Sequence, residues 1–314
     1  MGKPIVYIDG KEGTTGLQIY DRLAGREDIE LLLIDGDKRK DAAERKKLMN
    51  AADLVFLCLP DAAAVEAVEL VENPETRIID ASTAHRTAPG WVYGFPELGA
   101  DQREAIRTAK RVANPGCYAT GFISLAAPLV RTGLLDPNTP LACHAVSGYT
   151  GGGKKSIAQY EAADREAELV SPRHYAVTLA HKHIPEMMQV CGLTKKPVFM
   201  PMICDFPQGM VVTVPLYLDM LKGALDLDRL RQVYSDFYAG SRFVTVRPSG
   251  APACGFIGSN NLAGTNDLQI FVCGNEEQAM LASRLDNLGK GASGAAVQNM
   301  NIMLGFPEEA GLTK

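Results

Sequence analysis

The sequence lacks the features that mark membrane-spanning, disulfide-stabilised and zinc-binding proteins. No apolar stretch reaches the roughly 20 residues that cross a bilayer, because Asp, Glu, Lys or Arg interrupts each one. Its seven Cys are an odd, widely spaced set without a C-x-x-C pair, and none of its five His stands at zinc-finger spacing from them. We therefore expect neither disulfides nor a metal site. Most of the Cys lie in apolar runs and are expected to be buried thiols.

A strong charge of either sign is also missing. The formal net charge is -5, and the 32 Lys and Arg are scattered along the chain, which argues against a nucleic-acid surface. The first residues run directly into a strand pattern without a targeting signature, so we expect a cytoplasmic protein with no membrane partner. A length of 314 residues predicts two domains.

The first half of the chain has the pattern of an α/β domain. Short β-rich runs alternate with helices that are expected to begin near Thr15, Asp41 and Asp61. This order predicts a parallel sheet with crossover helices, in the manner of a Rossmann-type dinucleotide-binding domain. The expected strands are residues 4–9, 30–35, 53–60 and 76–80.

From about Asn114 the pattern changes to that of an α+β domain. A helix over residues 115–134 precedes longer runs rich in Val, Thr and aromatic residues, which predict a mixed or antiparallel sheet, and a last helix is expected over residues 282–306. We expect a dinucleotide-binding domain over residues 1–113, completed by residues 284–314, and a catalytic and oligomerisation domain over residues 114–283. The expected strands of the second domain are residues 141–148, 174–181, 199–206, 210–218, 242–248 and 268–274.

A glycine motif follows the first expected strand directly. Gly10, Gly13 and Gly16 form a G-x-x-G-x-x-G variant of the dinucleotide fingerprint, and Thr14 and Thr15 stand where the next helix begins. Glycines allow a sharp turn and a close approach to a pyrophosphate, whose charge is stabilised by free N–H groups at the helix N-terminus. In this strand–turn–helix context the motif predicts a nicotinamide dinucleotide site rather than a mere tight turn.

The end of the second expected strand carries opposing signals for NAD and NADP. Asp35 suits the 2′-hydroxyl of a ribose, whereas Lys38, Arg39 and Lys40 suit a 2′-phosphate. We favour NADP(H) as the cofactor; the alternative is that the three cations only solvate the start of a charged helix. Near the other end of the chain, Asn287 opens a glycine-dotted run and is expected to hold the nicotinamide amide.

One cysteine, Cys117, stands where a thiol would be reactive. It opens an apolar helix after a Pro-Gly turn, so the positive end of the helix favours its thiolate and free N–H groups can stabilise an oxyanion. We predict that Cys117 is a nucleophile; the alternative is a buried structural cysteine. His181 and His183 would point the same way in an extended segment. His181 is the preferred proton shuttle, and His183 and Glu186 are expected to contact the substrate.

Two further segments offer groups for anions. Ser82 and Arg86 follow the fourth expected strand, and we expect Ser82 near the cofactor and Arg86 to clamp an anion. Ser147 opens a glycine loop, expected to be flexible, that brings Lys154 or Lys155 to an anionic substrate. The loop is not a P-loop, because Lys155 occupies the position where Ser or Thr would hold magnesium, and this argues against a kinase.

Together these segments resemble the N-acetyl-gamma-glutamyl-phosphate reductase family, in its short (type 2) branch within the semialdehyde dehydrogenase superfamily. The similarity covers nearly the whole chain, and NPGCYATG is its most specific motif. The resemblance implies NADP as the cofactor, an acyl-phosphate substrate of arginine biosynthesis, Cys117 as the nucleophile and His181 as the base. A homodimer or homotetramer is expected. The other matching segments are DGKEGTTGLQI, STAHR, YGFPEL, SGYTGGGK, HKHIPE and DNLGKGASGAAVQN.

The implied reaction is the NADPH-dependent reduction of N-acetyl-L-glutamyl 5-phosphate to N-acetyl-L-glutamate 5-semialdehyde and phosphate, through a thioester on Cys117. One alternative is an aspartate-semialdehyde dehydrogenase or another acyl-phosphate reductase, which would share cofactor, nucleophile and chemistry. A second alternative is a non-catalytic NADP-binding protein, which would not need a helix-start cysteine paired with His181.

Overall fold

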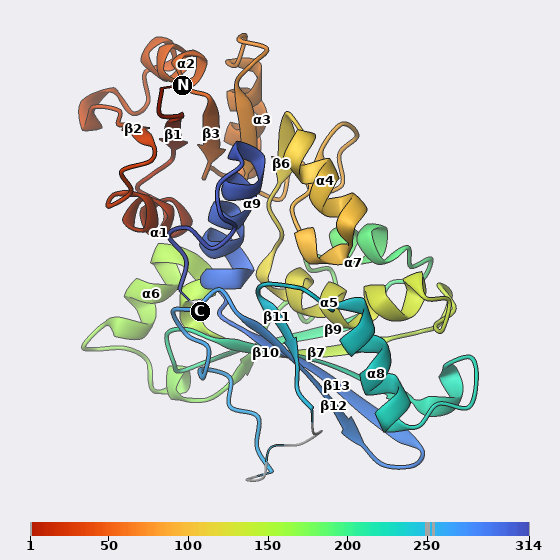
Figure 1. Cartoon of the computed structure of the whole chain (residues 1–314). Coiled ribbons are helices and arrows are strands. Elements are labelled where there is room, and N and C mark those ends of the chain that lie inside the picture. The colour runs from red at the N-terminus through yellow and green to blue at the C-terminus, as the bar shows by residue number, and fades with distance from the viewer. Residues whose placement is uncertain (1, 249–251, 253–254, 314) are drawn as a thin grey trace. The chain divides into compact units, whose positions relative to one another are not determined.

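The chain divides into two compact units, each built on its own sheet (Figure 1). The computed structural model describes residues 2–248, 252 and 255–313, so Cys254 lies outside the described residues. Within that part of the chain no helix has the length and apolarity to span a membrane. Unit 1 comprises Met1–Pro96, Ala100–Pro115 and Ala292–Leu312, and unit 2 comprises Glu97–Gly99, Gly116–Gly291 and Thr313–Lys314.

Unit 1 contains a six-stranded sheet in the order β2-β1-β3-β4-β6-β5, and every pairing in it is parallel. Its central strand β3 is buried along its whole length, as expected for a sheet covered on both faces. The Rossmann-type prediction is thereby confirmed. The strands are β1 (Ile5–Asp9), β2 (Glu30–Leu32), β3 (Leu54–Leu57), β4 (Arg77–Asp80), β5 (Val92–Tyr93) and β6 (Arg111–Ala113).

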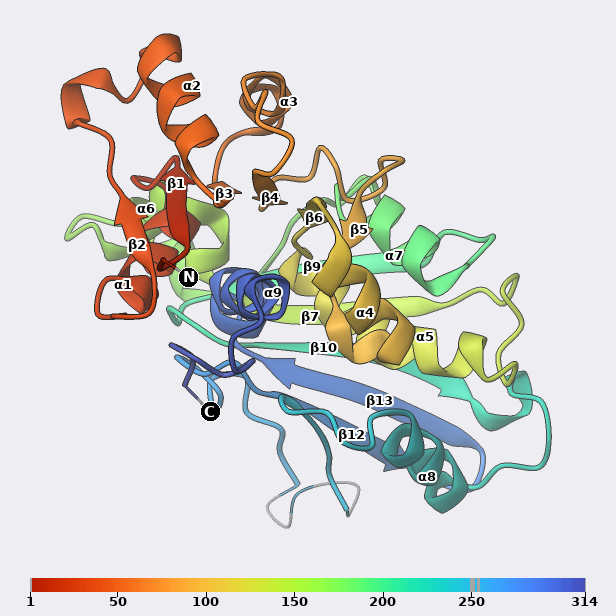
Figure 2. The ribbon, with the colours of Figure 1, turned by 45° about the horizontal axis from the view of Figure 1, so that its top comes forward.

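Helices cover both faces of this sheet (Figure 2). One face packs on α1 (Thr14–Leu23), α4 (Ala100–Thr108) and α9 (Gly294–Leu304). The other face packs on α2 (Ala42–Ala51) and α3 (Asp61–Glu69). The expected helix starts are confirmed to within a residue. α2 shows why, because the carboxylate of Asp41 accepts the N–H groups of Ala43 and Glu44 and so caps the helix.

Unit 2 contains a seven-stranded mixed sheet in the order β11-β12-β13-β10-β7-β9-β8. β10 pairs antiparallel with both of its neighbours, whereas β7 with β9 and β11 with β12 are parallel. The prediction of a mixed sheet is confirmed. The strands are β7 (Ala142–Gly148), β8 (Arg173–His174), β9 (Val198–Cys204), β10 (Met210–Tyr217), β11 (Val244–Val246), β12 (Leu268–Gly274) and β13 (Gln278–Leu285).

One face of this sheet carries helices. α5 (Cys117–Arg131) packs on β10 and β13, α8 (Leu227–Phe237) packs on β12 and β11, and α7 (Ile184–Cys191) packs against α5. α6 (Gly153–Glu161) follows the short helix η3 (Tyr149–Gly152). The opposite face exposes apolar side chains, namely Val198 and Met200 of β9, Tyr217 of β10 and Met280 of β13.

Two expected elements are wrong. The strand expected over residues 174–181 is only the two-residue β8, because Ala176 and Leu179 adopt positive φ angles of 50° and 57° that no strand contains. The helix expected over residues 282–306 begins only at Gly294. Its first residues are the end of β13, which is paired with β10 on one side and β12 on the other. A π-helical turn, Gly289–Ser293, precedes α9.

Candidate functional site

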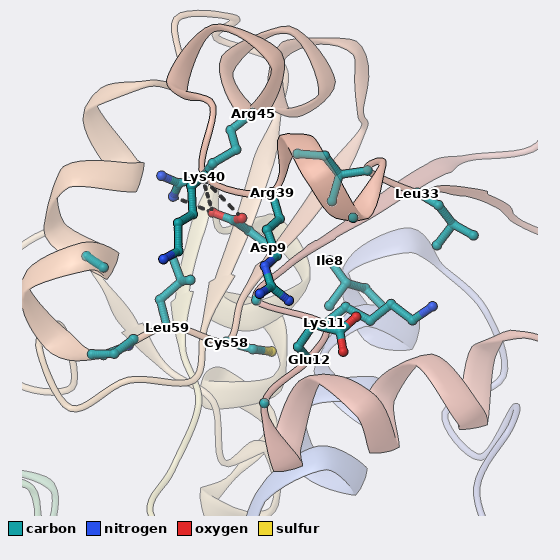
Figure 3. Close-up of a pocket in the computed structure, with 16 residues that line it drawn as sticks. Ile8, Asp9, Lys11, Glu12, Leu33, Arg39, Lys40, Arg45, Cys58 and Leu59 are labelled. Carbon is teal, nitrogen blue, oxygen red and sulfur yellow. Dashed lines mark hydrogen bonds and ion pairs between the residues drawn. The ribbon is translucent and has the colours of Figure 1, made fainter.

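A cavity of about 580 Å³ lies in unit 1 beside the carboxyl ends of β1 and β3 (Figure 3). It is lined by the end of β1 with the glycine turn after it, the loop after β2, Arg45 of α2 and the residues that follow β3. The chain leaves β1 toward β2 on one side and returns to β3 on the other. Open α/β sheets bind ligands at such a switch point.

The glycine turn is shaped by contacts that exclude side chains. Gly10 has a φ of +82°, and a Cβ there would lie 2.4 Å from the carbonyl oxygen of Cys58. A Cβ on Gly16 would lie 2.5 Å from the carbonyl oxygen of Gly10. Gly13 stands before α1 and offers no side-chain cap, so the first N–H groups of the helix have no side-chain acceptor from that position. Thr14 and Thr15 open α1 and are not among the cavity-lining residues.

One carboxylate at the cavity is neutralised by an arginine. Asp9, at the end of β1, is 3% exposed, and its two oxygens accept hydrogen bonds of 2.6 and 3.2 Å from Arg45 of α2. Burial, reinforced by the Asp9 carboxylate, raises the pKa of the neighbouring Tyr7. The pair fixes α2 to β1 and compensates a negative charge that would otherwise repel a pyrophosphate. Sequence reasoning missed both residues, because no motif joins them.

The loop after β2 carries both Asp35, which suits NAD, and the cations that suit NADP, and only cations among these residues reach the cavity. Arg39 and Lys40 line the cavity, as Figure 3 shows, whereas Lys38 does not. Asp35 is also absent from the lining, and its carboxylate accepts the N–H of Asp37 at 3.4 Å as the cap of a short helix. The cavity therefore offers cations, rather than the Asp35 carboxylate, to the adenosine end of a dinucleotide.

The loop after β4 is organised by buried Asp80. Its carboxylate accepts hydrogen bonds from the N–H and the hydroxyl of Ser82, at 2.9 and 2.7 Å, and lies 2.6 Å from Nδ1 of His85. Arg86 donates through Nε to the carbonyl oxygen of Asn114 at 2.9 Å, three residues before Cys117 in the chain. Neither Ser82 nor Arg86 lines the cavity. The hydrogen bonds of Ser82 shape the loop after β4, and that of Arg86 ties the loop to Asn114.

Cys117 lies in unit 2 as the first residue of α5. The residue before it, Gly116, has an extended conformation and no side chain to cap the helix. The thiol is half-buried beside two tyrosines that sequence reasoning missed, Tyr118 and Tyr175. The Tyr118 hydroxyl lies near the side chains of Tyr175 and Ser147. Tyr118 could have been predicted from the sequence, because it directly follows the predicted nucleophile, Cys117.

Both phenols are held in their protonated form. Burial, followed by the neighbouring Tyr175 and Cys117, raises the pKa of Tyr118 well above its ordinary value. Burial also raises the pKa of Tyr175. At neutral pH these groups therefore offer O–H donors next to the thiol, and they add no negative charge that would disfavour a thiolate.

The two predicted histidines join this group by a different route from the one expected. They lie in a turn that leads into α7, rather than in a strand, and their ring centroids are 4.6 Å apart. The His181 ring lies edge-on to Tyr118 at 5.7 Å, and its Nε2 is 3.4 Å from the Tyr175 hydroxyl. The backbone N–H of His183 donates to Nδ1 of His181 at 3.0 Å. A neutral His181 therefore carries its proton on Nε2.

Glu186 anchors the start of α5. Its side chain is 1% exposed, and its Oε2 accepts the backbone N–H of Gly116 at 3.1 Å. The residue lies in the first turn of α7, so one hydrogen bond links the helix that follows the histidines to the turn before the thiol. The sequence predicts Glu186 as a substrate contact, but it does not predict this hydrogen bond to the residue before Cys117.

The glycine loop after β7 is fixed at its beginning rather than flexible. Ser147 is buried, and Thr150 donates to the carbonyl oxygen of Pro207 at 2.6 Å. The Asn287 amide donates to the Thr150 hydroxyl at 3.0 Å and accepts the N–H of Gly209 at 2.8 Å. The Asn287 amide thus links the glycine loop after β7 to the loop between β9 and β10.

Lys154 and Lys155 begin α6 and are exposed. Neither makes a hydrogen bond or an ion pair with another residue in the described part of the chain. The structure therefore gives both lysines the same freedom to meet an anion, and does not separate them.

Comparison with known proteins gives matches over nearly the whole chain. Residues 6–109 match the NAD binding domain of semialdehyde dehydrogenases, and residues 117–287 match the dimerisation domain of the same family. An N-acetyl-gamma-glutamyl-phosphate reductase 2 of Nostoc sp. is 49% identical, over 99% of this chain and 100% of its own length. One of Burkholderia cenocepacia is 48% identical, over 97% of this chain and 98% of its own.

The fold is also found in solved structures. An aspartate semialdehyde dehydrogenase II from Vibrio cholerae superposes with a TM-score of 0.74 at 13% identity, covering 97% of this chain and 99% of that one. The aspartate semialdehyde dehydrogenase from Francisella tularensis gives a TM-score of 0.72 at 15% identity, covering 96% and 100%. At these identities the similarity establishes the fold alone.

The hydrogen bond from His183 to His181 predicts a single tautomer. In protein labelled with ¹⁵N-histidine, the neutral form of His181 is expected to give a pyridine-type Nδ1 signal and a pyrrole-type Nε2 signal, because Nδ1 is the acceptor of a backbone N–H. The signals that disappear in the His181→Asn variant assign the residue. A pyrrole-type Nδ1 on His181 would contradict the geometry.

Proposed function

This chain belongs to the N-acetyl-gamma-glutamyl-phosphate reductases of the semialdehyde dehydrogenase family, and on that premise we propose that it reduces N-acetyl-L-glutamyl 5-phosphate to N-acetyl-L-glutamate 5-semialdehyde and phosphate with NADPH. This is a step of arginine biosynthesis. The observation that carries the proposal is Cys117, a half-buried thiol at the N-terminus of a 15-residue helix, beside two protonated tyrosines and His181.

Cys117 supplies the nucleophile in this proposal. Its thiolate is favoured by the uncapped start of α5. The sulfur forms a bond to the acyl carbon, the bond from that carbon to the phosphate oxygen breaks, and a thioester remains on Cys117. The N–H groups of the first turn of α5 stabilise the negative charge that builds on the acyl oxygen.

We propose that His181, predicted from sequence as the proton shuttle, acts through the tautomer that its contacts favour. With Nδ1 engaged by the N–H of His183, the neutral ring carries its proton on Nε2. When bound, NADPH supplies the hydride. Nε2–H donates a hydrogen bond to the thioester oxygen as that oxygen gains negative charge. The tetrahedral anion then collapses to the aldehyde as the C–S bond breaks and Cys117 leaves as a thiolate, so the imidazole keeps its proton.

The cavity of unit 1 fits a dinucleotide with a 2′-phosphate. The glycine turn leaves room for the pyrophosphate against the start of α1, and Arg39 and Lys40 would hold the 2′-phosphate. Asn287 and Ser82, proposed from sequence as cofactor contacts, would bind through the second amide N–H of Asn287 and a lone pair of the Ser82 hydroxyl, in addition to the hydrogen bonds that these groups already make.

The substrate is an anion with two charged ends, and the proposed contacts match it. Lys154 and Lys155 are exposed cations at the start of α6, the helix that follows the loop opened by Ser147. Arg86, His183 and Glu186 complete the proposed substrate contacts. The alternative substrate is aspartyl phosphate, because the superposed solved structures are aspartate semialdehyde dehydrogenases. The names of the more similar relatives favour the N-acetylglutamyl substrate.

We also propose that the protein is a homodimer or homotetramer assembled through the open face of the unit 2 sheet. The face exposes Met200, Tyr217 and Met280, and the matched family domain is a dimerisation domain. Burial of such a patch is favourable.

The cytoplasm is the proposed location, since the six described cysteines are free thiols, which suits a reducing compartment.

The reaction is tested by phosphate-dependent reduction of NADP with each semialdehyde. N-acetylglutamate semialdehyde is expected to be oxidised with a kcat/KM at least about a hundredfold above that for aspartate semialdehyde, as for a site whose polar groups are matched to one substrate. The Cys117→Ser variant is the control: it should lose turnover while binding NADPH with an unchanged Kd. Preference for aspartate semialdehyde would refute the substrate, and full turnover by Cys117→Ser would refute the thioester.

The cofactor preference is tested by neutralising single cations. Arg39→Gln and Lys40→Gln should each raise the Kd for NADPH about tenfold while changing that for NADH little, because a charge-assisted contact contributes roughly 1.5–3 kcal/mol and exposure reduces it. Lys38→Gln is the matched control, since Lys38 belongs to the same basic run and does not line the cavity. Equal effects on both cofactors would show that Arg39 and Lys40 do not read the 2′-phosphate.

The assembly is tested by sedimentation velocity. Met200→Glu and Met280→Glu each place a charge on the open face and are expected to shift the protein toward monomer. Val65→Glu is the matched control, because Val65 is an exposed apolar residue of α3 in unit 1. If both sheet variants sediment as the parent protein does, association does not use this face.

A further inference from the structure

Lys290 and Glu97 form a buried ion pair, and the residue after Lys290, Gly291, packs against Cys117. Lys290 Nζ is 2.7 Å from Glu97 Oε1, and the two side chains are 1% and 0% exposed. The ammonium of Lys290 also lies 5.8 Å from the ring centroid of Phe243. Neither charged residue belongs to the cofactor cavity, and neither was assigned a role above.

Gly291, the next residue, packs against the thiol-bearing residue. A Cβ placed on Gly291 would lie 2.7 Å from the Cβ of Cys117 and 3.1 Å from its Cα. The backbone of Gly291 is therefore in contact with Cys117. The N–H of Gly291 donates to the carbonyl oxygen of Asp286 at 2.9 Å, within the π-helical turn that contains both Lys290 and Gly291. Such single π-helical turns are frequent at functional sites.

The partner of Lys290 is tied to the other end of α5. Leu98, next to Glu97, accepts a hydrogen bond of 2.7 Å from Arg131, the last residue of α5. Residues 97–98 therefore touch the end of the helix, while Lys290 and Gly291 connect the same segment to its beginning. Through these contacts residues 97–98 are connected to both ends of α5.

A purely stabilising role does not explain why this pair is ionic. Removing two charges from water costs several kcal/mol per ion, and replacing a buried pair by apolar side chains of similar size is often neutral or stabilising. What an ion pair adds is direction, because the ammonium and the carboxylate fix where the Lys290 backbone lies. That backbone carries Gly291.

We propose that the Lys290–Glu97 pair is a positioning device for Cys117, holding the Gly291 backbone against the residue so that its thiol occupies the reactive position. The inference rests on the proposed role of Cys117 as the nucleophile. Lys290 and Glu97 act through Gly291 and touch no reacting atom.

The test replaces both charges at once. In the double variant Lys290→Met with Glu97→Met, both charges of the pair are removed together, so the protein should fold and bind NADPH with an unchanged Kd. We expect kcat to fall by about tenfold or more at an unchanged KM for the semialdehyde, the result of a small misplacement of a reacting group. Alkylation of Cys117 by iodoacetamide, followed by mass spectrometry of its peptide, should also slow.

A matched control removes another buried contact of the same helix. Tyr234 donates to the carbonyl oxygen of Leu125 in α5 at 2.6 Å, so Tyr234→Phe should lower the unfolding temperature while leaving kcat and the alkylation rate unchanged. A double variant that keeps the parental kcat and alkylation rate overturns the positioning role. Restoration of both by Lys290→Arg with Glu97→Asp, which keeps a pair of opposite charges, would support it.

A second variant covers the case in which the double variant does not fold. Gly291→Ala adds one Cβ at the contact with Cys117 and leaves the ion pair intact. It should reproduce the loss of kcat and the slower alkylation; parental values for both would overturn the inference. Failure of the proposed function is seen separately, as turnover by Cys117→Ser, whereas alkylation of Cys117 reports its position without any turnover.

Discussion

An uncapped helix start inside a packed interior is the constraint on which unit 2 depends. The first turn of an α-helix leaves up to four N–H groups without intrahelical partners, and those groups are what make the start of α5 useful to a thiolate and an oxyanion. A side-chain cap would occupy one of them. Gly116 supplies none, and the turn is held from outside instead, by Glu186 at the Gly116 N–H and by Gly291 at Cys117.

The charged residues discussed above divide into two classes by burial. Asp9 with Arg45 and Glu97 with Lys290 are paired in the interior, where an unpaired charge would cost several kcal/mol. The buried Asp80 carboxylate is held by hydrogen bonds from Ser82 and by Nδ1 of His85. Arg39, Lys40, Lys154 and Lys155 are exposed and make no ion pair with another described residue. The paired charges shape loops and helix starts. The exposed cations remain available to ligand phosphates and carboxylates.

The sequence predicts the parts of this structure whose causes are local. The cap at Asp41 and the close approach of Gly16 to Gly10 act within a few residues, so α2 and α1 begin where expected. Residues 174–181 have the composition of a strand, but positive φ angles at Ala176 and Leu179 leave no trace in residue type. Pairs such as Asp9 with Arg45, or Glu97 with Lys290 at 193 residues' separation, exist only once the chain has folded.

Motif membership does not separate residues that bind ligands from residues that build the site. Asn287 and Glu186 stand in segments that carry the family resemblance, yet their polar atoms bond to Gly209, Thr150 and Gly116. Glycine loops and helix starts have little side-chain material of their own, so distant polar side chains must fix their backbones. A site that binds its ligand through backbone N–H groups therefore uses many of its motif residues to hold that backbone in place. In this chain a binding role for either residue therefore has to be shared with a structural one.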